Sequence, residues 1–226
     1  MNSIRLETIS KYFNQGDRVA DIGCDHGYLG IYALKRGVSL LQLVDNKKGP
    51  LQSAVTNLAK ELKKENNPET IFTLSSGLNN LDKRINKIAI SGMGGHLIIE
   101  ILTEHIELVK EFDSIILQAN SKVKELREFL SQNHFEIISE EIVFEKGKFY
   151  EIIVSKYVFQ TPFLSETDCY FGPVLRLKRS QNFIKKYIER LKTLEKIINT
   201  YSLSLVKKKT FLKEIYIIRK ELNDES

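Results

Sequence analysis

Val19-Ala20-Asp21-Ile22-Gly23-Cys24-Asp25-His26-Gly27-Tyr28 reads as a buried β-strand that ends in a glycine-rich loop and continues directly into a helix. In an open parallel sheet, ligands bind beside the carboxyl ends of the strands, where such a loop lies. A dinucleotide-binding loop would carry G-x-G-x-x-G, because pyrophosphate binds bare amides at a helix N-terminus. Here Asp25 replaces the second glycine, and Asp21 stands near the end of the strand.

Two carboxylates would repel a pyrophosphate, but they suit a ligand with a positive charge and free hydroxyls, such as S-adenosylmethionine. The alternative is a tight strand-to-helix turn with solvated acids. The candidate cofactor contacts in this loop are Asp21, Gly23, Asp25, His26, Gly27 and Tyr28.

A further acid, Asp45, follows the next predicted strand, about two dozen residues beyond the loop, where it can accept hydrogen bonds from both ribose hydroxyls of an adenosine. The alternative for Asp45 is a simple turn acid before Gly49-Pro50. Ser75-Ser76-Gly77-Leu78 follows the third strand and should lie under the adenine of the cofactor. The candidate contacts here are Asp45, Asn46, Ser76, Gly77 and Leu78.

Strand and helix patterns alternate through the first two thirds of the chain, which indicates right-handed βαβ units and a parallel sheet. The predicted strands are Arg18–Ile22, Leu40–Val44, Ile71–Leu74, Lys87–Ile90 and Ser114–Leu117, and the predicted helices are residues 2–13, Tyr28–Lys35, 50–64, Leu97–Leu102 and Lys122–Asn133. Two β-rich runs, Phe135–Phe144 and Lys148–Tyr157, flank Glu145-Lys146-Gly147 and predict a hairpin. The pattern predicts an α/β fold of the class I Rossmann-like methyltransferase type: a mostly parallel sheet ending in an antiparallel hairpin, over residues 1–160.

The last third, residues 161–226, has a different pattern. Proline, glycine and isolated aromatic residues predict a linker over residues 160–182. An apolar seam in steps of three and four then predicts a coiled-coil helix, interrupted at residues 206–210. Its members are Ile184, Tyr187, Leu191, Leu194, Ile198, Tyr201 and Leu205, followed by Phe211, Ile215, Ile218 and Leu222. We expect a two-helix antiparallel hairpin, and the alternative is one long helix that dimerises.

Composition bounds the remaining possibilities. The chain has 226 residues, of which 42% are hydrophobic, enough for one sizeable core and a smaller appendage. No apolar run approaches the roughly 20 residues needed to cross a bilayer, and the N-terminus has no signal-peptide h-region. The two cysteines, Cys24 and Cys169, make no disulfide framework and predict a cytoplasmic protein, while the spacing of His and Cys predicts no catalytic metal.

The positive charge is concentrated in the last third. Residues 160–226 contain 14 Lys and Arg against 8 Asp and Glu, whereas residues 1–159 contain 20 against 21. This asymmetry suggests a nucleic-acid partner. A lysine-rich solvated helical face would give the same count.

Two further strand ends carry polar or flexible residues. Ser91-Gly92-Met93-Gly94-Gly95 follows the fourth strand, where glycines allow a flat ligand to approach and Met93 offers an apolar wall against a base. Gln118 and Asn120 end the fifth strand with amides suited to a base edge, or else cap the next helix. The candidates here are Gly92, Met93, Gly94 and Asn120.

In combination these motifs resemble the bacterial TrmK family of tRNA (adenine(22)-N1)-methyltransferases, and the resemblance spans nearly the whole chain. It rests on residues 21–29, Gly49-Pro50, residues 91–95, residues 117–120, Tyr150-Glu151 and Gly172-Pro173. The chain departs from the family's usual residues at Asp45, where Glu is more frequent, at Ala119, where Pro is, and at Ser76, where Asp is.

The resemblance implies methyl transfer from S-adenosyl-L-methionine to N1 of adenine 22 in tRNA, with S-adenosyl-L-homocysteine as the product. It implies a Rossmann-like domain at residues 1–160 and a coiled-coil hairpin within residues 161–226. An adenine flipped out of the RNA would meet Asp25, Met93 and Asn120 as candidate catalytic residues. Asp25 would hold the methionine ammonium or read the adenine amino group, and His26 and Tyr28 would shape the pocket floor, stack on a base or serve the turn alone.

The resemblance also implies that basic residues of the C-terminal hairpin hold tRNA phosphates. The candidates are Arg176, Lys178, Arg179, Lys185, Lys186, Arg190, Lys207, Lys208 and Lys209. We expect a monomer or weak dimer. Two other functions remain open at this point: a non-enzymatic RNA-binding protein on a degenerate methyltransferase fold, and a methyltransferase that acts on a small molecule or a protein.

Overall fold

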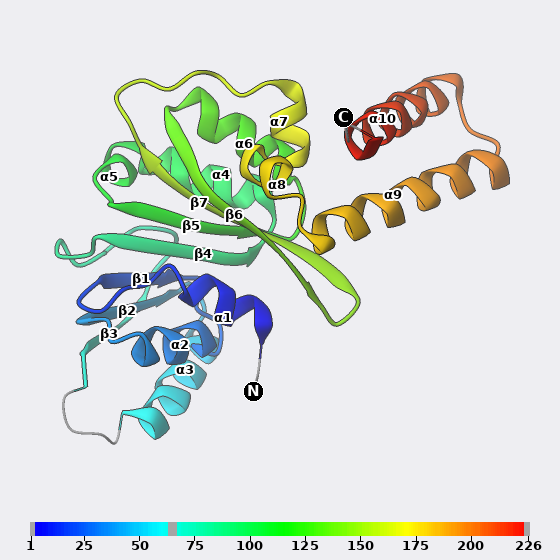
Figure 1. The fold of residues 1–226 in the computed structure, drawn as a ribbon. Coiled ribbons are helices and arrows are strands. Elements are labelled where there is room, and N and C mark those ends of the chain that lie inside the picture. The colour runs from blue at the N-terminus through cyan, green and yellow to red at the C-terminus, as the bar shows by residue number, and fades with distance from the viewer. Residues whose placement is uncertain (1–2, 63–66, 224–226) are drawn as a thin grey trace. The chain divides into compact units, whose positions relative to one another are not determined.

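The computed structural model describes residues 3–62 and 67–223, which form an α/β fold with a helical C-terminal part (Figure 1). Two compact units divide the chain, Met1–Val174 and Leu175–Ser226. The elements are α1 (Ile4–Ser10), β1 (Arg18–Ile22), α2 (Tyr28–Lys35), β2 (Leu40–Asp45), α3 (Lys48–Glu61), β3 (Glu69–Leu74), β4 (Lys87–Met93), α4 (Gly95–Glu104), α5 (Ile106–Lys110), β5 (Ser114–Ala119), α6 (Val123–Gln132), β6 (Phe135–Glu145), β7 (Lys148–Tyr157), α7 (Glu166–Phe171), α8 (Pro173–Lys178), α9 (Gln181–Thr200) and α10 (Leu205–Asn223). Among the described residues, no helix is long and apolar enough to span a membrane.

One seven-stranded sheet organises the first unit, with the strand order β3-β2-β1-β4-β5-β7-β6. The strands from β3 to β5 are parallel, and β7 pairs antiparallel with both β5 and β6. The order reverses between β1 and β4, so the carboxyl ends of these two strands flank the topological switch point. The predicted class of fold, a mostly parallel sheet finished by an antiparallel hairpin, is confirmed.

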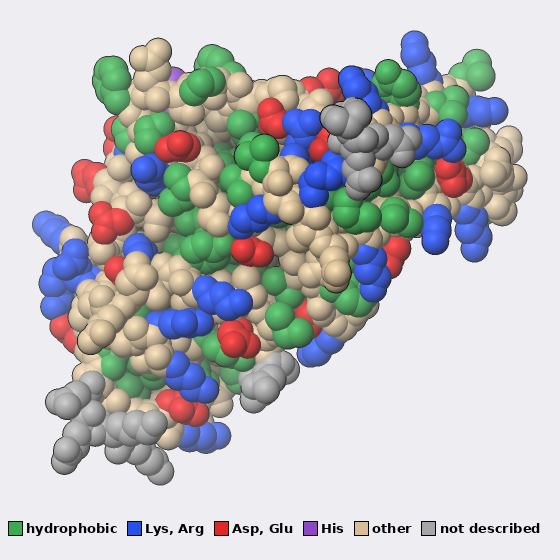
Figure 2. All heavy atoms as spheres, viewed as in Figure 1, with side chains coloured by type: hydrophobic (Ala, Val, Ile, Leu, Met, Phe, Trp, Pro, Cys, Tyr) green, Lys and Arg blue, Asp and Glu red, His purple; other side chains and the backbone are tan. Residues whose placement is uncertain are grey.

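The second unit consists of the end of α8 and two longer helices, α9 and α10, of which α10 runs back along α9 (Figure 1). Phe183, Tyr187 and Leu194 on α9 and Ile215 and Ile218 on α10 are buried. Lys and Arg side chains gather over these helices in Figure 2. The coiled-coil geometry of the pair stays a prediction.

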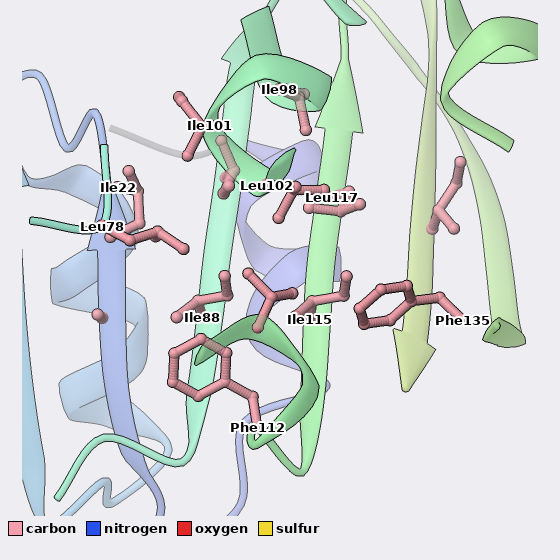
Figure 3. Close-up of a cluster of buried hydrophobic side chains, with 14 of the residues drawn as sticks. Ile22, Leu78, Ile88, Ile98, Ile101, Leu102, Phe112, Ile115, Leu117 and Phe135 are labelled. Atoms are coloured by element: carbon pink, nitrogen blue, oxygen red, sulfur yellow. The ribbon is translucent and has the colours of Figure 1, made fainter. Parts of the chain in front are cut away.

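Two apolar clusters lie on opposite faces of the sheet and hold it between helices. On one face, strands β1, β4 and β5 pack against α4, α5 and α6, and Figure 3 shows Ile88, Leu117 and Leu102 within this cluster. On the other face, the sheet packs against α1, α2 and α3 through residues such as Ile9 and Leu58. Strands β2 and β5 are buried along their whole length, as expected for strands covered on both faces.

Several predicted boundaries were wrong by a few residues. α1 ends at Ser10 rather than residue 13, and Asn2 lies outside the described residues. α3 begins at Lys48, so Pro50 stands within its first turn, where the missing amide hydrogen costs nothing. The predicted end of this helix at Lys64 also lies outside the described residues. β4 and β5 extend into the motif residues, to Met93 and Ala119.

The predicted linker at residues 160–182 contains two short helices, α7 and α8, and residues 161–174 belong to the first unit. Ser131 Oγ accepts a hydrogen bond from the Leu164 N–H at 2.8 Å, and Arg127 Nη1 donates to the Cys169 carbonyl at 3.3 Å. Side-chain anchors of this kind hold a segment whose proline and glycine content alone indicates a loop.

The predicted interruption of the helical seam was also misplaced. Residues 206–210 are helical, and the break lies at residues 201–204. Lys is a good helix former, whereas Ser204 caps α10 by accepting a hydrogen bond from the Lys207 N–H at 3.4 Å. As a result Tyr201 and Leu205 are 63% and 87% exposed rather than part of the seam.

Candidate active site

The loop after β1 is fixed to the end of β2 by backbone hydrogen bonds. The N–H groups of Gly23 and Cys24 both donate to the Val44 carbonyl, at 2.8 and 3.0 Å. Gly23, Asp25 and Gly27 all have positive φ, at +71°, +50° and +71°. This backbone conformation favours glycine, so the strained residue in the loop is Asp25. Strain of this kind is characteristic of functional sites.

Asp45 is nearly buried at the end of β2 and orders the residues around it. Its Oδ2 accepts from the Asp25 N–H at 3.0 Å, and its Oδ1 accepts from the Lys47 N–H at 2.9 Å. A carboxylate has about four lone-pair positions, so each oxygen keeps one for a ligand.

A pocket of about 340 Å³, here called the β2–β3 pocket, lies beside this carboxylate. Its lining combines Asp45 and Asn46 with Ser76 and Gly77, which follow β3. The apolar side of the pocket comes from Leu97 and Ile101 of α4, from Ile22 and Val44, and from Pro50. Polar groups on one side and an apolar wall on the other suit a ribose joined to a flat base.

A second pocket of about 380 Å³, here called the β1–β4 pocket, lies between the carboxyl ends of β1, β4 and β5. Its lining residues are Arg5, Leu6, Asp21, Gly23, Cys24, Asp25, His26, Tyr28, Leu29, Ser91, Gly92, Met93, Asn120 and Tyr150. The rings of His26 and Tyr28 lie 5.9 Å apart between centroids, and His26 Nε2 is 3.6 Å from Asp25 Oδ1. This pocket is the more polar of the two, and aromatic rings stand at its walls.

The two pockets meet at three shared residues: Gly23, Asp25 and Met93. The Met93 side chain fills the place above Gly23, because a Cβ built on Gly23 would lie only 2.0 Å from Met93 Cε. The positive φ of Gly23 favours glycine at this position, and a larger residue would also have to displace the end of the Met93 side chain. A ligand in one pocket would touch a ligand in the other across Met93 and Asp25.

Asp21 lies in the wall of the β1–β4 pocket, and within the described part of the chain one of its carboxylate oxygens is unpaired. Its Oδ2 is buried and has no hydrogen-bond partner among the described residues. Burial, together with the nearby Asp45 and Asp25, raises the pKa of Asp21 from 3.8 to about 7. Burial likewise raises the pKa of the adjacent Cys24 thiol, which is therefore not a reactive thiolate.

A buried carboxylate without a partner fits a cationic ligand group, because the cation would supply the missing donor. S-adenosylmethionine has such a group, its methionine ammonium, and the β2–β3 pocket offers the acid and the apolar wall for its adenosine. The residues present therefore fit this cofactor. Among the described residues, no three His, Cys, Asp or Glu side chains gather into a possible metal site.

The backbone of Gly92 and the side-chain amides of Gln118 and Asn120 form a closed ring of hydrogen bonds at the end of β5. Gln118 Oε1 accepts from the Gly92 N–H at 3.1 Å, Gln118 Nε2 donates to Asn120 Oδ1 at 3.1 Å, and Asn120 Nδ2 donates to the Gly92 carbonyl at 2.6 Å. Arg5 Nη1 also donates to Gln118 Oε1, and the Arg5 guanidinium stacks 5.1 Å above the centre of the Tyr150 ring.

The structure brings most of the predicted site residues to the two pockets but places three elsewhere. Leu78 is buried in the core, Gly27 precedes α2, where a built Cβ would lie 2.8 Å from Ala54 Cβ, and Gly94 precedes α4. Sequence reasoning missed Arg5 as a pocket residue and gave Tyr150 no role there. Arg5 comes from α1, which precedes β1, and Tyr150 comes from β7, and no spacing pattern joins either residue to the glycine loop.

The predicted RNA contacts lie in two different settings in the second unit. Arg176, Arg179 and Arg190 form internal ion pairs, with Glu221 or Glu214. Lys185 lies 4.0 Å from Glu189, and Lys186 stacks on Tyr187. Lys178 and the run Lys207, Lys208 and Lys209 are exposed, and no ion pair between the run and a carboxylate occurs within the part of the chain that the structure describes.

Comparison with known proteins identifies relatives along nearly the whole chain. The sequence model of the TrmK family, described as tRNA (adenine(22)-N(1))-methyltransferase, matches residues 19–223. The Bacillus subtilis tRNA (adenine(22)-N(1))-methyltransferase is 30% identical over 210 residues, which cover 88% of this chain and 85% of the relative.

Solved structures agree with this assignment. The Streptococcus pneumoniae protein Sp1610, solved in complex with S-adenosyl-L-methionine, has a TM-score of 0.87 at 33% identity, covering 99% of this chain and 100% of that one. The Mycoplasma capricolum TrmK, solved with S-adenosyl-homocysteine, has a TM-score of 0.84 at 26% identity, covering 99% and 98%. The chain therefore belongs to the TrmK family of tRNA (adenine(22)-N(1))-methyltransferases.

Proposed function

We infer that this protein transfers a methyl group from S-adenosyl-L-methionine to N1 of adenine 22 in tRNA, which leaves S-adenosyl-L-homocysteine. Within the structure, the observation that carries this function is the pair of pockets that meet at Gly23, Asp25 and Met93. Methyl transfer needs a donor and an acceptor in contact at one point, and two adjoining pockets with a shared wall supply that arrangement.

The β2–β3 pocket is the proposed adenosine site. Asp45 would accept hydrogen bonds from the ribose hydroxyls through its remaining lone pairs, and Ser76 and Gly77 would lie against the adenine. Asp21 would pair with the methionine ammonium, which supplies the donor that its Oδ2 lacks. Gly23 and Asp25 line both pockets and would therefore lie along the cofactor between these two ends.

The β1–β4 pocket, beside the methionine end of the cofactor at Asp21, is the proposed site of the target adenine. Met93 offers an adaptable apolar wall, and Asn120 offers an amide to the base edge. His26 and Tyr28 provide aromatic surface for a base that has left the RNA stack. Asp25 lies where the two ligands would meet, and we assign it to the reacting centre.

Methyl transfer to adenine N1 requires mainly that the protein align the two reactants. S-adenosyl-L-methionine supplies a methyl group that is already activated on a positively charged sulfur. The neutral N1 of adenine has a lone pair, so the new N–C bond forms as the S–C bond breaks, and no general base is required. The residues of the two pockets hold N1 in line with the methyl group, and proximity of this kind is worth several orders of magnitude in rate. The methylated base is a cation, which the carboxylate of Asp25 at the junction of the pockets would stabilise until the base loses its N6 proton.

We propose that the second unit binds tRNA. Its exposed lysines, Lys207, Lys208 and Lys209 above all, would contact phosphates without reading sequence. We further propose that the protein works in the cytoplasm, as a monomer or weak dimer and without a metal. Two buried free cysteines support a reducing compartment.

Methylation of defined transcripts tests this function. Purified protein is incubated with labelled S-adenosyl-L-methionine, a metal chelator and an unmodified tRNA transcript, and the product nucleotide is mapped by mass spectrometry. We expect one N1-methyladenosine at position 22 and no product when that adenine is replaced by uracil. Methylation at another nucleotide, or none by a protein that binds the cofactor, would contradict the proposal. Transfer to protein or to a small molecule instead would favour the alternative substrate classes.

A further inference from the structure

The ring of amides between Gly92, Gln118 and Asn120 has a fixed direction. Two groups, the Arg5 guanidinium and the Gly92 N–H, point at the same atom of Gln118, and both can only donate. That atom must therefore be the carbonyl oxygen Oε1. The Gln118 amide nitrogen then faces Asn120, so the Asn120 atom that meets it must be the acceptor Oδ1.

The far end of the ring agrees with this direction. Asn120 Nδ2 faces the Gly92 carbonyl, which can only accept, at 2.6 Å. Gln118 is fully buried, so neither water nor a turned amide can replace the bonds it makes without leaving a polar group unpaired. The charge on Arg5 makes its bond to Gln118 the strongest kind in the network.

Arg5 is itself held firmly in place. Its guanidinium stacks on Tyr150, and its helix, α1, is tied down at the first turn. There the Ile4 N–H donates to Glu145 Oε1 at 2.9 Å, and the Ser3 N–H donates to the Tyr32 hydroxyl at 3.0 Å. The helix also buries Ile9 completely.

Asn120 keeps one free position on each side of its amide. It is exposed and lines the β1–β4 pocket, and Oδ1 has one lone pair left and Nδ2 one hydrogen left. An asparagine amide pairs with the N6 and N7 edge of adenine, because N6 donates and N7 accepts. That pairing leaves N1 free for methylation. Guanine presents two acceptors on the same edge, O6 and N7, and its O6 would face the fixed Oδ1 oxygen.

We propose that Arg5 is a positioning residue that fixes the amide of Asn120 through Gln118, so that Asn120 recognises the N6/N7 edge of the target adenine. The proposal rests on the proposed function, since it concerns the base that is methylated. Without Arg5, Gln118 loses its charged donor, and only the Gly92 N–H and carbonyl still hold the two amides. The Asn120 amide would then be held less firmly against N6 and N7.

Substrate analogues combined with variants test this coupling. The substrates are tRNAs that carry adenosine or 7-deazaadenosine at position 22, and the second lacks N7 but keeps N1. For the unmodified protein, we expect 7-deazaadenosine to lower the single-turnover methylation rate about 10-fold, the effect of one lost hydrogen bond. Arg5→Met should lower the rate on adenosine by about 10-fold and show little further loss with 7-deazaadenosine, because the N7 contact is already impaired.

A second variant tests the middle of the chain of hydrogen bonds. Gln118→Glu keeps an acceptor for Arg5 and Gly92 but places an oxygen against Asn120 Oδ1. It should also lose most of the sensitivity to 7-deazaadenosine. Arg18→Met is the matched control and should keep the wild-type sensitivity, because Arg18 begins β1, at the other end of the strand from the pockets. Cofactor affinity measured by calorimetry should be unchanged in Arg5→Met, which shows that the fold is intact.

Two results would overturn the proposal. If Arg5→Met and 7-deazaadenosine lower the rate by factors that simply multiply, Arg5 acts independently of Asn120, for instance on a phosphate. If Gln118→Glu keeps the full sensitivity to 7-deazaadenosine, the amide chain does not set the contact. Failure of the unmodified protein to methylate tRNA with adenosine at position 22 would instead overturn the proposed function.

Discussion

Asp45 illustrates how one residue serves both the fold and the proposed cofactor site. It receives the N–H groups of Asp25 and Lys47, and so it fixes the loop after β1 as well as the turn after β2. Asp45 also lines the β2–β3 pocket, and its carboxylate has lone pairs left for a ligand there. We therefore expect a neutral or shorter side chain at this position to weaken ligand binding in the pocket more than it weakens the sheet.

Asp45→Ala should weaken the binding of S-adenosyl-L-methionine by about 10- to 100-fold, because hydrogen bonds to a charged group are each worth about 1.5–3 kcal/mol. Isothermal calorimetry measures this directly. Asp113→Ala is the control and should bind the cofactor normally, because Asp113 precedes β5 at the other end of the strands from the pockets. Unchanged affinity in Asp45→Ala would refute the assignment of this acid to the ribose.

Asp21 should make stability depend on pH. Its pKa is raised from 3.8 to about 7 in the folded protein, so between these pH values the folded state holds a proton that the unfolded state has lost. Stability contributed by this group therefore falls as pH rises from about 4 to 7 and is constant above, a loss on the order of 4 kcal/mol.

Denaturant unfolding from pH 5 to 8 should show the larger part of this loss in the wild-type protein and a much smaller loss in Asp21→Asn. Saturating S-adenosyl-L-methionine should reduce the difference, because the ammonium would pair with the ionised acid. Parallel pH profiles for the two proteins would contradict the role assigned to Asp21.

At the scale of elements, the start of α4 is packed against the start of α6. Gly95 donates its N–H to the Ser121 carbonyl at 2.9 Å, and a Cβ at this position would lie 2.5 Å from the Lys122 carbonyl oxygen. This close approach holds the ends of β4 and β5 together, and with them Met93 and Asn120. Gly95 therefore serves the packing of two backbone segments, whereas the role of the glycine run in admitting a flat ligand stays a prediction.

Gly95→Ala should destabilise the protein by about 1–3 kcal/mol and lower the methylation rate, because the two backbones must move apart. Gly49→Ala is the matched control, since Gly49 lies in α3 with no atom within 4 Å of a built Cβ. Alanine there should be neutral or stabilise the helix by up to about 1 kcal/mol. Thermal unfolding compares the two, and equal effects would contradict this account.

Another element-scale feature is a buried ion cluster between α6, β6 and β7. Arg127 is fully buried and donates to Glu140 at 2.8 Å and to Glu151 at 2.6 Å. Burial raises the pKa of Glu140 in spite of this partner. A Cβ at Gly172 would lie 2.7 Å from both Arg127 Nη2 and Glu140 Oε2, so the chain passes this cluster closely.

Arg127→Met should destabilise the protein by about 3–5 kcal/mol at pH 8, because two buried carboxylates lose their partner. The loss should shrink toward pH 5, where the carboxylates can take up protons. Arg84→Met removes an exposed arginine paired with Asp82 and Glu69 and should change stability little at either pH. Denaturant titrations measure both, and a pH-independent loss in Arg127→Met would contradict the explanation.

At the scale of the whole molecule, charge is divided unevenly along the chain. Residues 160–226 carry the excess of Lys and Arg, and exposed basic side chains gather over α9 and α10 (Figure 2). Several arginines there are engaged in internal ion pairs, so the lysines at the start of α10 are the stronger candidates for phosphate contacts.

Replacement of Lys207, Lys208 and Lys209 by Glu should weaken tRNA binding and lower the slope of log affinity against log salt by about 2–3, the value for three phosphate contacts. Replacing Lys35, Lys60 and Lys83 of the first unit by Glu changes net charge equally and is the control. The proposal fails if both triple variants give the same slope.

The sequence by itself determined the sheet and most of the proposed cofactor pocket. Buried strands and intervening helices have distinct periods, and the acid and glycine positions at strand ends depend only on local order along the chain. Asp21, Gly23, Asp25 and Asp45 were therefore predictable, whereas the helical break was misplaced because Lys207, Lys208 and Lys209 continue a helix once Ser204 caps it.

Only the tertiary structure decided which distant residues complete the site. Arg5 reaches it because α1 packs against β6 and α2, and Tyr150 because β7 inserts next to β5. The unpartnered oxygen of Asp21 and the fixed direction of the Asn120 amide are likewise properties of packing, since burial and hydrogen-bond partners come from all sides of a side chain. The residue pattern of Val19–Tyr28 predicts the strand and the glycine loop that follows it. The charge state of Asp21 in this stretch follows instead from the residues that the fold places around it.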